Sequence, residues 1–108
     1  MRRGDLAELK VKKILLSGYV QDNMIYTCKV LNFSEKEECL YLLLEDNELE
    51  EVSLDCIYEC KVKSQDCITS FTGRIKERYI GYEGKKIKIQ VENGFYKINL
   101  KSVDKQIV

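Results

Sequence analysis

Apolar and polar residues alternate along much of this 108-residue chain. Such period-two alternation is typical of β-strands that place one face on a core and the other in water. The alternation is clearest over residues 52–62, where the even-numbered positions are apolar and the odd-numbered ones, apart from Ile57, are polar. We therefore expect a core strand there, with its even-numbered side chains, Leu54 included, pointing inward.

Further segments have the pattern and the spacing of strands separated by polar turns. They cover residues 10–16, 24–33, 39–44, 67–79, 86–92 and 95–101. Glycines separate several of these segments: Gly81 and Gly84 predict a hairpin, and Gly94 is expected to turn the chain into the last strand. Near the N-terminus, Asp5 followed three residues later by Glu8 has the form of a capping box, which predicts a helical turn at residues 6–9.

Seven strands at intervals of about ten residues predict an all-β fold. We expect an antiparallel barrel or split barrel of six to seven strands, with a short N-terminal helical turn. The length fits one domain that spans residues 1–108, because the composition shows no break or linker.

Composition narrows the classes of function. Eighteen basic and eighteen acidic residues cancel, which argues against a general nucleic-acid binder, because such proteins gain affinity by neutralising phosphates. No stretch approaches the roughly 20 apolar residues of a membrane helix, and no signal peptide follows the first residues. We therefore expect no membrane insertion and a cytoplasmic location.

The residues that usually carry catalysis or hold a metal are scarce. Histidine is absent, which removes the commonest general base and the imidazole metal ligand. The five cysteines form no C-x-x-C, so we expect reduced core thiols, with Cys28, Cys56 and Cys60 buried. On a strand Cys56 and Cys60 would lie about 13 Å apart, too far to share a zinc ion. No nucleophile is paired with a base, so we expect no enzyme, no cofactor and no metal site.

Basic residues are concentrated on two neighbouring predicted strands. Alternate residues of a strand point to the same side about 6.5–7 Å apart, and a hairpin around residues 81–84 would join the two sets into one basic stripe. The stripe consists of Arg74, Lys76, Arg78, Lys86 and Lys88. Phe95 lies opposite the apolar face of its own strand and is expected to be partly exposed nearby. Because guanidinium groups bind anions and aromatic rings are enriched at interfaces, these six residues are the candidate ligand- or partner-binding site. The alternative is a solvated face whose charges are balanced by neighbouring acids.

The order of several local patterns suggests a known scaffold. The patterns are residues 26–30 (Tyr-Thr-Cys-Lys-Val), residues 53–62, residues 73–75 (Gly-Arg-Ile) and residues 93–96 (Asn-Gly-Phe-Tyr). Together they resemble the barrel of PilZ-type proteins, most closely the N-terminal accessory domain of the flagellar-brake type. PilZ domains that bind cyclic di-GMP share an R-x-x-x-R before the barrel and a D/N-x-S-x-x-G on an early strand. Here Arg74 and Arg78 match R-x-x-x-R but lie late, and D/N-x-S-x-x-G is absent. The resemblance implies the scaffold and a protein-contact role.

These observations lead to one favoured function and two alternatives. We expect a non-catalytic interaction module with a protein partner, and the resemblance implies a place in bacterial cyclic-dinucleotide signalling or motility. The first alternative is a binding domain for a phosphorylated second messenger of the cyclic di-GMP type, which would use the basic stripe. The second is an RNA-binding small β-barrel that would add the nearby tyrosines to the same stripe.

Overall fold

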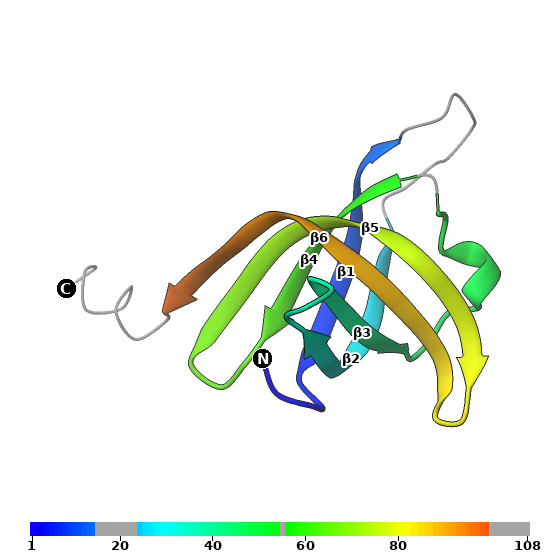
Figure 1. Cartoon of the computed structure of the whole chain (residues 1–108), viewed down its shortest axis with the longest axis horizontal. Coiled ribbons are helices and arrows are strands. Elements are labelled where there is room, and N and C mark those ends of the chain that lie inside the picture. The colour runs from blue at the N-terminus through cyan, green and yellow to red at the C-terminus, as the bar shows by residue number, and fades with distance from the viewer. Residues whose placement is uncertain (15–23, 55, 100–108) are drawn as a thin grey trace.

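The chain forms a closed antiparallel β-barrel in a computed structural model that describes residues 1–14, 24–54 and 56–99 (for residues 13, 14 and 95–99, the backbone alone) (Figure 1). The order of strands around the described barrel is β1-β2-β3-β6-β5-β4. The strands are β1 (Leu6–Ile14), β2 (Ile25–Ser34), β3 (Cys39–Leu44), β4 (Cys56–Lys63), β5 (Cys67–Gly81) and β6 (Gly84–Asn99). A short 3₁₀ helix, η1 (Leu49–Glu51), precedes β4. The all-β barrel predicted from the alternation is confirmed.

The alternation also places the core correctly in most strands. Along β4 every even-numbered side chain from Cys56 to Val62 is fully buried, as predicted, and Tyr26, Cys28 and Val30 of β2 share the inner face. The large side chains that fill the barrel centre are Leu9, Leu40, Leu42, Tyr58, Phe71, Ile87 and Ile89. Buried apolar area contributes about 25 cal/mol per Å², so these inner faces supply most of the driving force for folding.

The helical turn predicted at residues 6–9 is wrong, because these residues open strand β1. Ala7 and Leu9 are fully buried and alternate with more exposed neighbours, which is the period of a strand. The Asp5 carboxylate does not cap a helix. It accepts hydrogen bonds from the backbone N–H of Arg2 and from the Ser64 hydroxyl, each at 2.8 Å. Burial inside the barrel therefore overrides the local capping signal.

The inward position predicted for Leu54 is also wrong. Strand β4 begins at Cys56, and Leu54 is 43% exposed in the segment that precedes it. Leu49 of η1 and Val52 just after it are buried and belong to the core cluster. The chain thus crosses one end of the barrel before it enters β4, and the alternation is interrupted there.

The turn predicted at Gly94 does not form, because β6 runs without interruption from Gly84 to Asn99. The predicted sixth and seventh strands are therefore one strand. Near Gly94 its pairing with β5 shifts register twice: Ser70 pairs with Tyr96 but Thr72 with Asn93, and Gly73 then pairs with Val91. These β-bulges bend the long strand where a turn was expected. The hairpin predicted around residues 81–84 is confirmed, since Gly81 pairs with Gly84.

Candidate binding surfaces

A β-bulge in β5 divides the predicted basic stripe. Ile75 pairs with Ile89, but the next pair joins Glu77 to Lys88, so Lys76 is an extra residue without a partner on β6. Directly opposed residues of an antiparallel pair share a face. Arg78 pairs with the buried Ile87, which places Arg78 on the inner face at the end of the barrel. The prediction that Arg74, Lys76 and Arg78 share one face is therefore wrong, because the bulge changes the register between them.

Arg78 serves the fold at this position. Its Nη1 donates hydrogen bonds to the carbonyl oxygens of Leu49 at 3.1 Å and Glu50 at 3.4 Å, and also to that of Val52. These carbonyls belong to η1 and the residue after it, where a single helical turn leaves most of its carbonyls without partners. The guanidinium thus fastens η1 across the barrel end.

Most of the remaining basic residues of the stripe are held by acidic neighbours on the outer face. Nε of Arg74 lies 2.7 Å from Oε1 of Glu92, and Nζ of Lys86 lies 3.3 Å from Oε1 of Glu83. Lys76 is exposed, with no ion pair in the part of the chain that the structure describes. The outer face is therefore largely charge-balanced, as the solvated-face alternative predicts.

Lys88 is the most closely held of these cations. Its Nζ donates to Oε2 of Glu37 at 2.9 Å and lies 5.6 Å from the centre of the Tyr41 ring, whose hydroxyl donates to the other oxygen of Glu37. The hydrogen bond to Glu37, followed by the contact with Tyr41, raises the pKa of Lys88. The same bonds from Lys88 and Tyr41 lower the pKa of Glu37. The group joins β6 to the β2–β3 connection and leaves little of Lys88 free for a ligand.

Phe95, the last predicted site residue, lies outside the described side chains. Its backbone is part of β6, beyond the bulges near Asn93.

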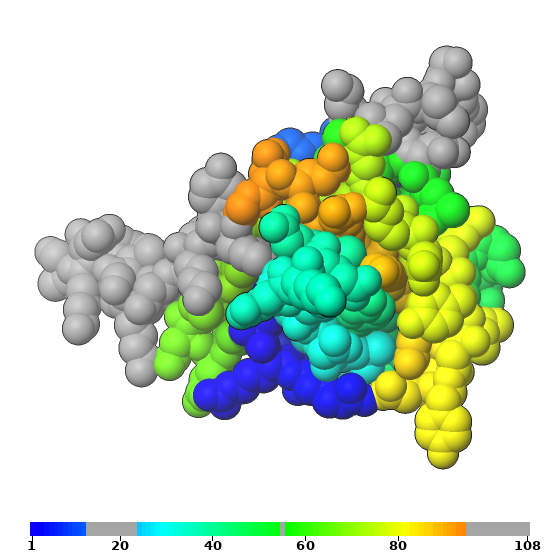
Figure 2. All heavy atoms as spheres, viewed as in Figure 1, coloured from blue at the N-terminus to red at the C-terminus, as the bar shows by residue number. Residues whose placement is uncertain are grey.

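The two most exposed apolar side chains in the described part of the chain lie at the tip of the β5–β6 hairpin. Ile80 is 79% exposed, Tyr82 is fully exposed and Tyr79 is 38% exposed. In Figure 1 this hairpin extends past the other strands, and Figure 2 shows its yellow atoms projecting from the body of the molecule. The sequence places both tyrosines near the turn. The exposure of the tip, however, depends on how far β5 and β6 extend beyond the ends of the neighbouring strands.

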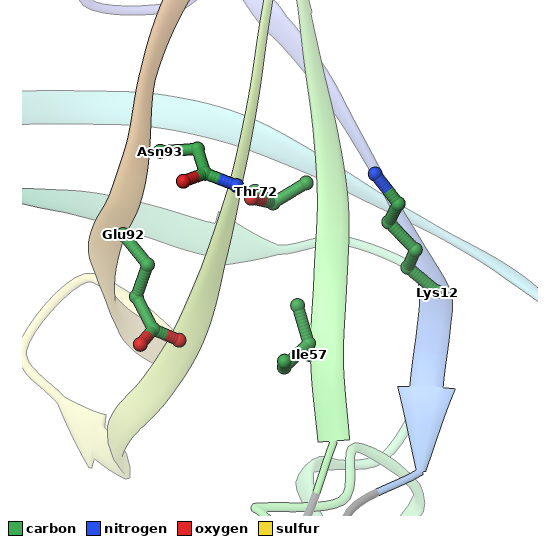
Figure 3. Close-up of a pocket in the computed structure, with 5 residues that line it drawn as sticks. All are labelled: Lys12, Ile57, Thr72, Glu92 and Asn93. Carbon is green, nitrogen blue, oxygen red and sulfur yellow. The ribbon is translucent and has the colours of Figure 1, made fainter.

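A separate hollow lies on the outer face and extends over the successive neighbouring strands β1, β4, β5 and β6. Its volume is about 330 Å³, and it is lined by Lys12, Ile57, Thr72, Glu92 and Asn93 (Figure 3). Thr72 is only 9% exposed. None of these residues was predicted as a site, because bulges in two of the strands bring them together.

The cysteines are free thiols, and Cys28, Cys56 and Cys60 are buried as predicted. Burial raises the pKa of Cys28 to about 12, and burial and the nearby Cys28 raise that of Cys60 further. Within the described ranges no group of histidine, cysteine or acidic side chains is arranged to hold a metal ion. No helix in that same part of the chain is long and apolar enough to cross a membrane.

Comparison of the chain with known proteins found no relative. No family model, no curated protein and no solved structure matches this chain.

Proposed function

We propose that the protein is a non-catalytic interaction module that contacts a protein partner through the tip of the β5–β6 hairpin. The observation that carries the proposal is the exposure of Tyr79, Ile80 and Tyr82 within four residues of one turn. Single exposed apolar residues are ordinary, whereas a cluster of them marks an interaction surface. Tyrosine is also enriched among the residues that carry most of the energy of protein interfaces.

The base of the hairpin is held rigidly, which favours binding because little order is lost when a partner docks. On the inner face, Arg78 is bonded to the η1 carbonyls, and Nζ of Lys85 donates to the carbonyl of Asn47 at 2.6 Å. At the turn, Glu83 forms ion pairs with both Arg3 and Lys86. These charged groups form a polar rim around the apolar tip, which is the usual anatomy of a protein interface.

The alternative of a phosphorylated second messenger has less support. It needs free cations on one face, whereas Arg74, Lys86 and Lys88 each contact a carboxylate and Arg78 faces the other side. The RNA-binding alternative depends on the same cations. A place in cyclic-dinucleotide signalling or motility therefore rests on the PilZ-type resemblance and is part of the proposal.

The test begins with a photoreactive p-benzoylphenylalanine in place of Tyr82, which captures the partner from cells for identification. The partner is then purified, and its affinity is measured for the wild-type chain and for Ile80→Ser. We expect at least a tenfold loss of affinity, because truncating an interface anchor costs about 2 kcal/mol.

Ile25→Ser is the matched control, since Ile25 is a half-exposed isoleucine at the start of β2, away from the hairpin. It should bind like the wild type. Equal affinity of the wild type, Ile80→Ser and Tyr82→Ser would refute the proposal. Self-association that disappears in Ile80→Ser would instead assign the tip to a contact between two copies of this chain.

A further inference from the structure

The chain contains one Asn-Gly sequence, Asn93-Gly94, and it lies between the two β-bulges of β6. β6 has one residue more than β5 before Asn93, where Glu92 is extra. It again has one more after Asn93, where Gly94 and Phe95 lie opposite a single residue of β5. A bulge leaves its extra residue unpaired and disrupts the ladder locally. The peptide bond that joins Asn93 to Gly94 is therefore held by fewer strand hydrogen bonds than one in a regular strand.

The other side of β6 lacks a strand partner at the same place. β3 pairs with β6 only as far as Gln90, and the backbone N–H of Val91 then donates to the carbonyl oxygen of Glu38 at 2.9 Å. From Glu92 onward, no strand in the described ranges pairs with this side of β6. Local opening costs least where backbone hydrogen bonds are few and exposed to water. The backbone around Asn93 can therefore open without unfolding of the barrel.

The side chain of Asn93 is exposed and not engaged. It lines the hollow on the outer face, where water has access, and within the described residues no hydrogen bond holds its amide. Gly94 is equally accessible, since a Cβ atom built on it would meet no atom within 4 Å. Asn47 differs, because its Nδ2 donates to Oε2 of Glu51 at 3.1 Å and the next residue is a glutamate.

A free asparagine amide followed by an unshielded glycine nitrogen is the arrangement that deamidates. Once hydroxide has removed its proton, the backbone nitrogen of Gly94 attacks Cγ of Asn93, because glycine has no Cβ to shield the nitrogen or restrict the backbone. The new N–C bond closes a succinimide ring, the Cγ–Nδ2 bond breaks, and the amide nitrogen leaves as ammonia. Water then opens the ring at either carbonyl, which gives aspartate or isoaspartate without any oxidation or reduction. We infer that Asn93 is a site of spontaneous deamidation in the folded protein.

The two products change β6 in different ways. Aspartate adds a negative charge next to Glu92, whose Oε1 already accepts a hydrogen bond from Nε of Arg74. Isoaspartate carries the main chain through the former side chain and lengthens it by one methylene, so the pairing of the following residues with β5 is disturbed. The reaction is independent of the hairpin tip, which lies at the start of β6.

The test compares the whole protein with a synthetic peptide of residues 90–97, both incubated for several weeks at 37 °C. Peptide mass spectrometry follows the loss of Asn93. In a fully paired strand the reaction would wait for global unfolding and would be at least about a thousandfold slower than in the peptide. We expect it to be slower by less than about a hundredfold, because local opening is sufficient. The rate should rise about tenfold from pH 7 to pH 8, as the fraction of deprotonated nitrogen does.

Gly94→Ala is the matched variant, since its Cβ would meet no atom and the backbone of Gly94 is not in the left-handed region. It should keep the wild-type circular dichroism spectrum and lose Asn93 at least about tenfold more slowly, because the methyl group shields the nitrogen. Asn47 is the internal control and should remain intact in the same samples. An isoaspartyl methyltransferase should label the aged wild type much more strongly than the aged variant.

Three results would overturn the inference. The first is a rate in the folded protein more than about a hundredfold below that of the peptide. The second is a folded Gly94→Ala variant that loses Asn93 as fast as the wild type. The third is equal loss of Asn47 and Asn93, since neither the glycine nor the free amide would then matter.

Discussion

Replacing Arg78 with methionine removes the guanidinium that fastens η1 and keeps most of the aliphatic stem. Two of its three carbonyl partners lie at 3.1 and 3.4 Å, and the third is that of Val52. One nitrogen carries two hydrogens, so about two well-aligned bonds exist at a time. A hydrogen bond to a charged group contributes about 1.5 kcal/mol at the low end of its range, which suits this partly exposed site. The expected loss in the free energy of unfolding is therefore about 2–3 kcal/mol.

Urea denaturation followed by far-UV circular dichroism measures this loss, and Tm should fall by roughly 10 °C. Arg74→Met is the matched control on the same strand. It breaks only the exposed ion pair with Glu92, so its loss should stay below about 1 kcal/mol. A loss below about 0.5 kcal/mol for Arg78→Met, or equal losses for both variants, would show that Arg78 does not anchor η1.

Three further predictions follow from the described contacts. Gly73→Ala should cost about 3 kcal/mol or more in urea denaturation, because the new Cβ would meet a carbonyl oxygen at 2.1 Å and the strands would have to separate; a loss under about 1 kcal/mol would contradict this close approach. Glu37 has a lowered pKa through its bond from Lys88, so its contribution to stability is present above the ordinary value of 4.5 and is lost as the pH falls through the lowered folded-state value; Glu37→Gln should flatten the acid side of the stability curve, and an unchanged curve would contradict the ion pair. In native protein at pH 8, a thiol reagent should label the half-buried Cys67 before Cys28, whose pKa is about 12; rapid native labelling of Cys28 would contradict its burial.

The strands were predictable because alternation is a local property. Strand β3 has the predicted bounds and β2 is displaced by one residue, since each is a continuous apolar or alternating run between polar turns. The first strand was predicted at residues 10–16, but its start at Leu6 was missed, because a local signal, Asp5 with Glu8, competed with burial of Ala7 and Leu9 inside the barrel. The intrinsic preference of a residue for a helix is small compared with the free energy gained by burying these side chains.

The candidate sites were less predictable because bulges belong to pairs of strands. Nothing in the residue types at Lys12, Lys76 or Glu92 distinguishes them from ordinary strand residues. Each is a bulge only because the paired strand has one residue fewer over the same stretch. A shift of one residue moves the following side chains to the other face of the sheet. Arg78 therefore points to the inner face and does not belong to the predicted stripe. The hollow over β1, β4, β5 and β6 could not be predicted from the sequence for the same reason.

The length of the β5–β6 hairpin itself points to a contact. β4 pairs with β5 only as far as Arg74, and β3 pairs with β6 only as far as Lys86. Barrel closure therefore does not require the residues at the tip. Beyond Arg78, Ile80 continues the inner-face alternation past the barrel end, where no described core residue covers it. An isoleucine in that position gives little burial energy in the free molecule and adds a risk of aggregation, whereas a partner that covers the tip would bury it together with Tyr82.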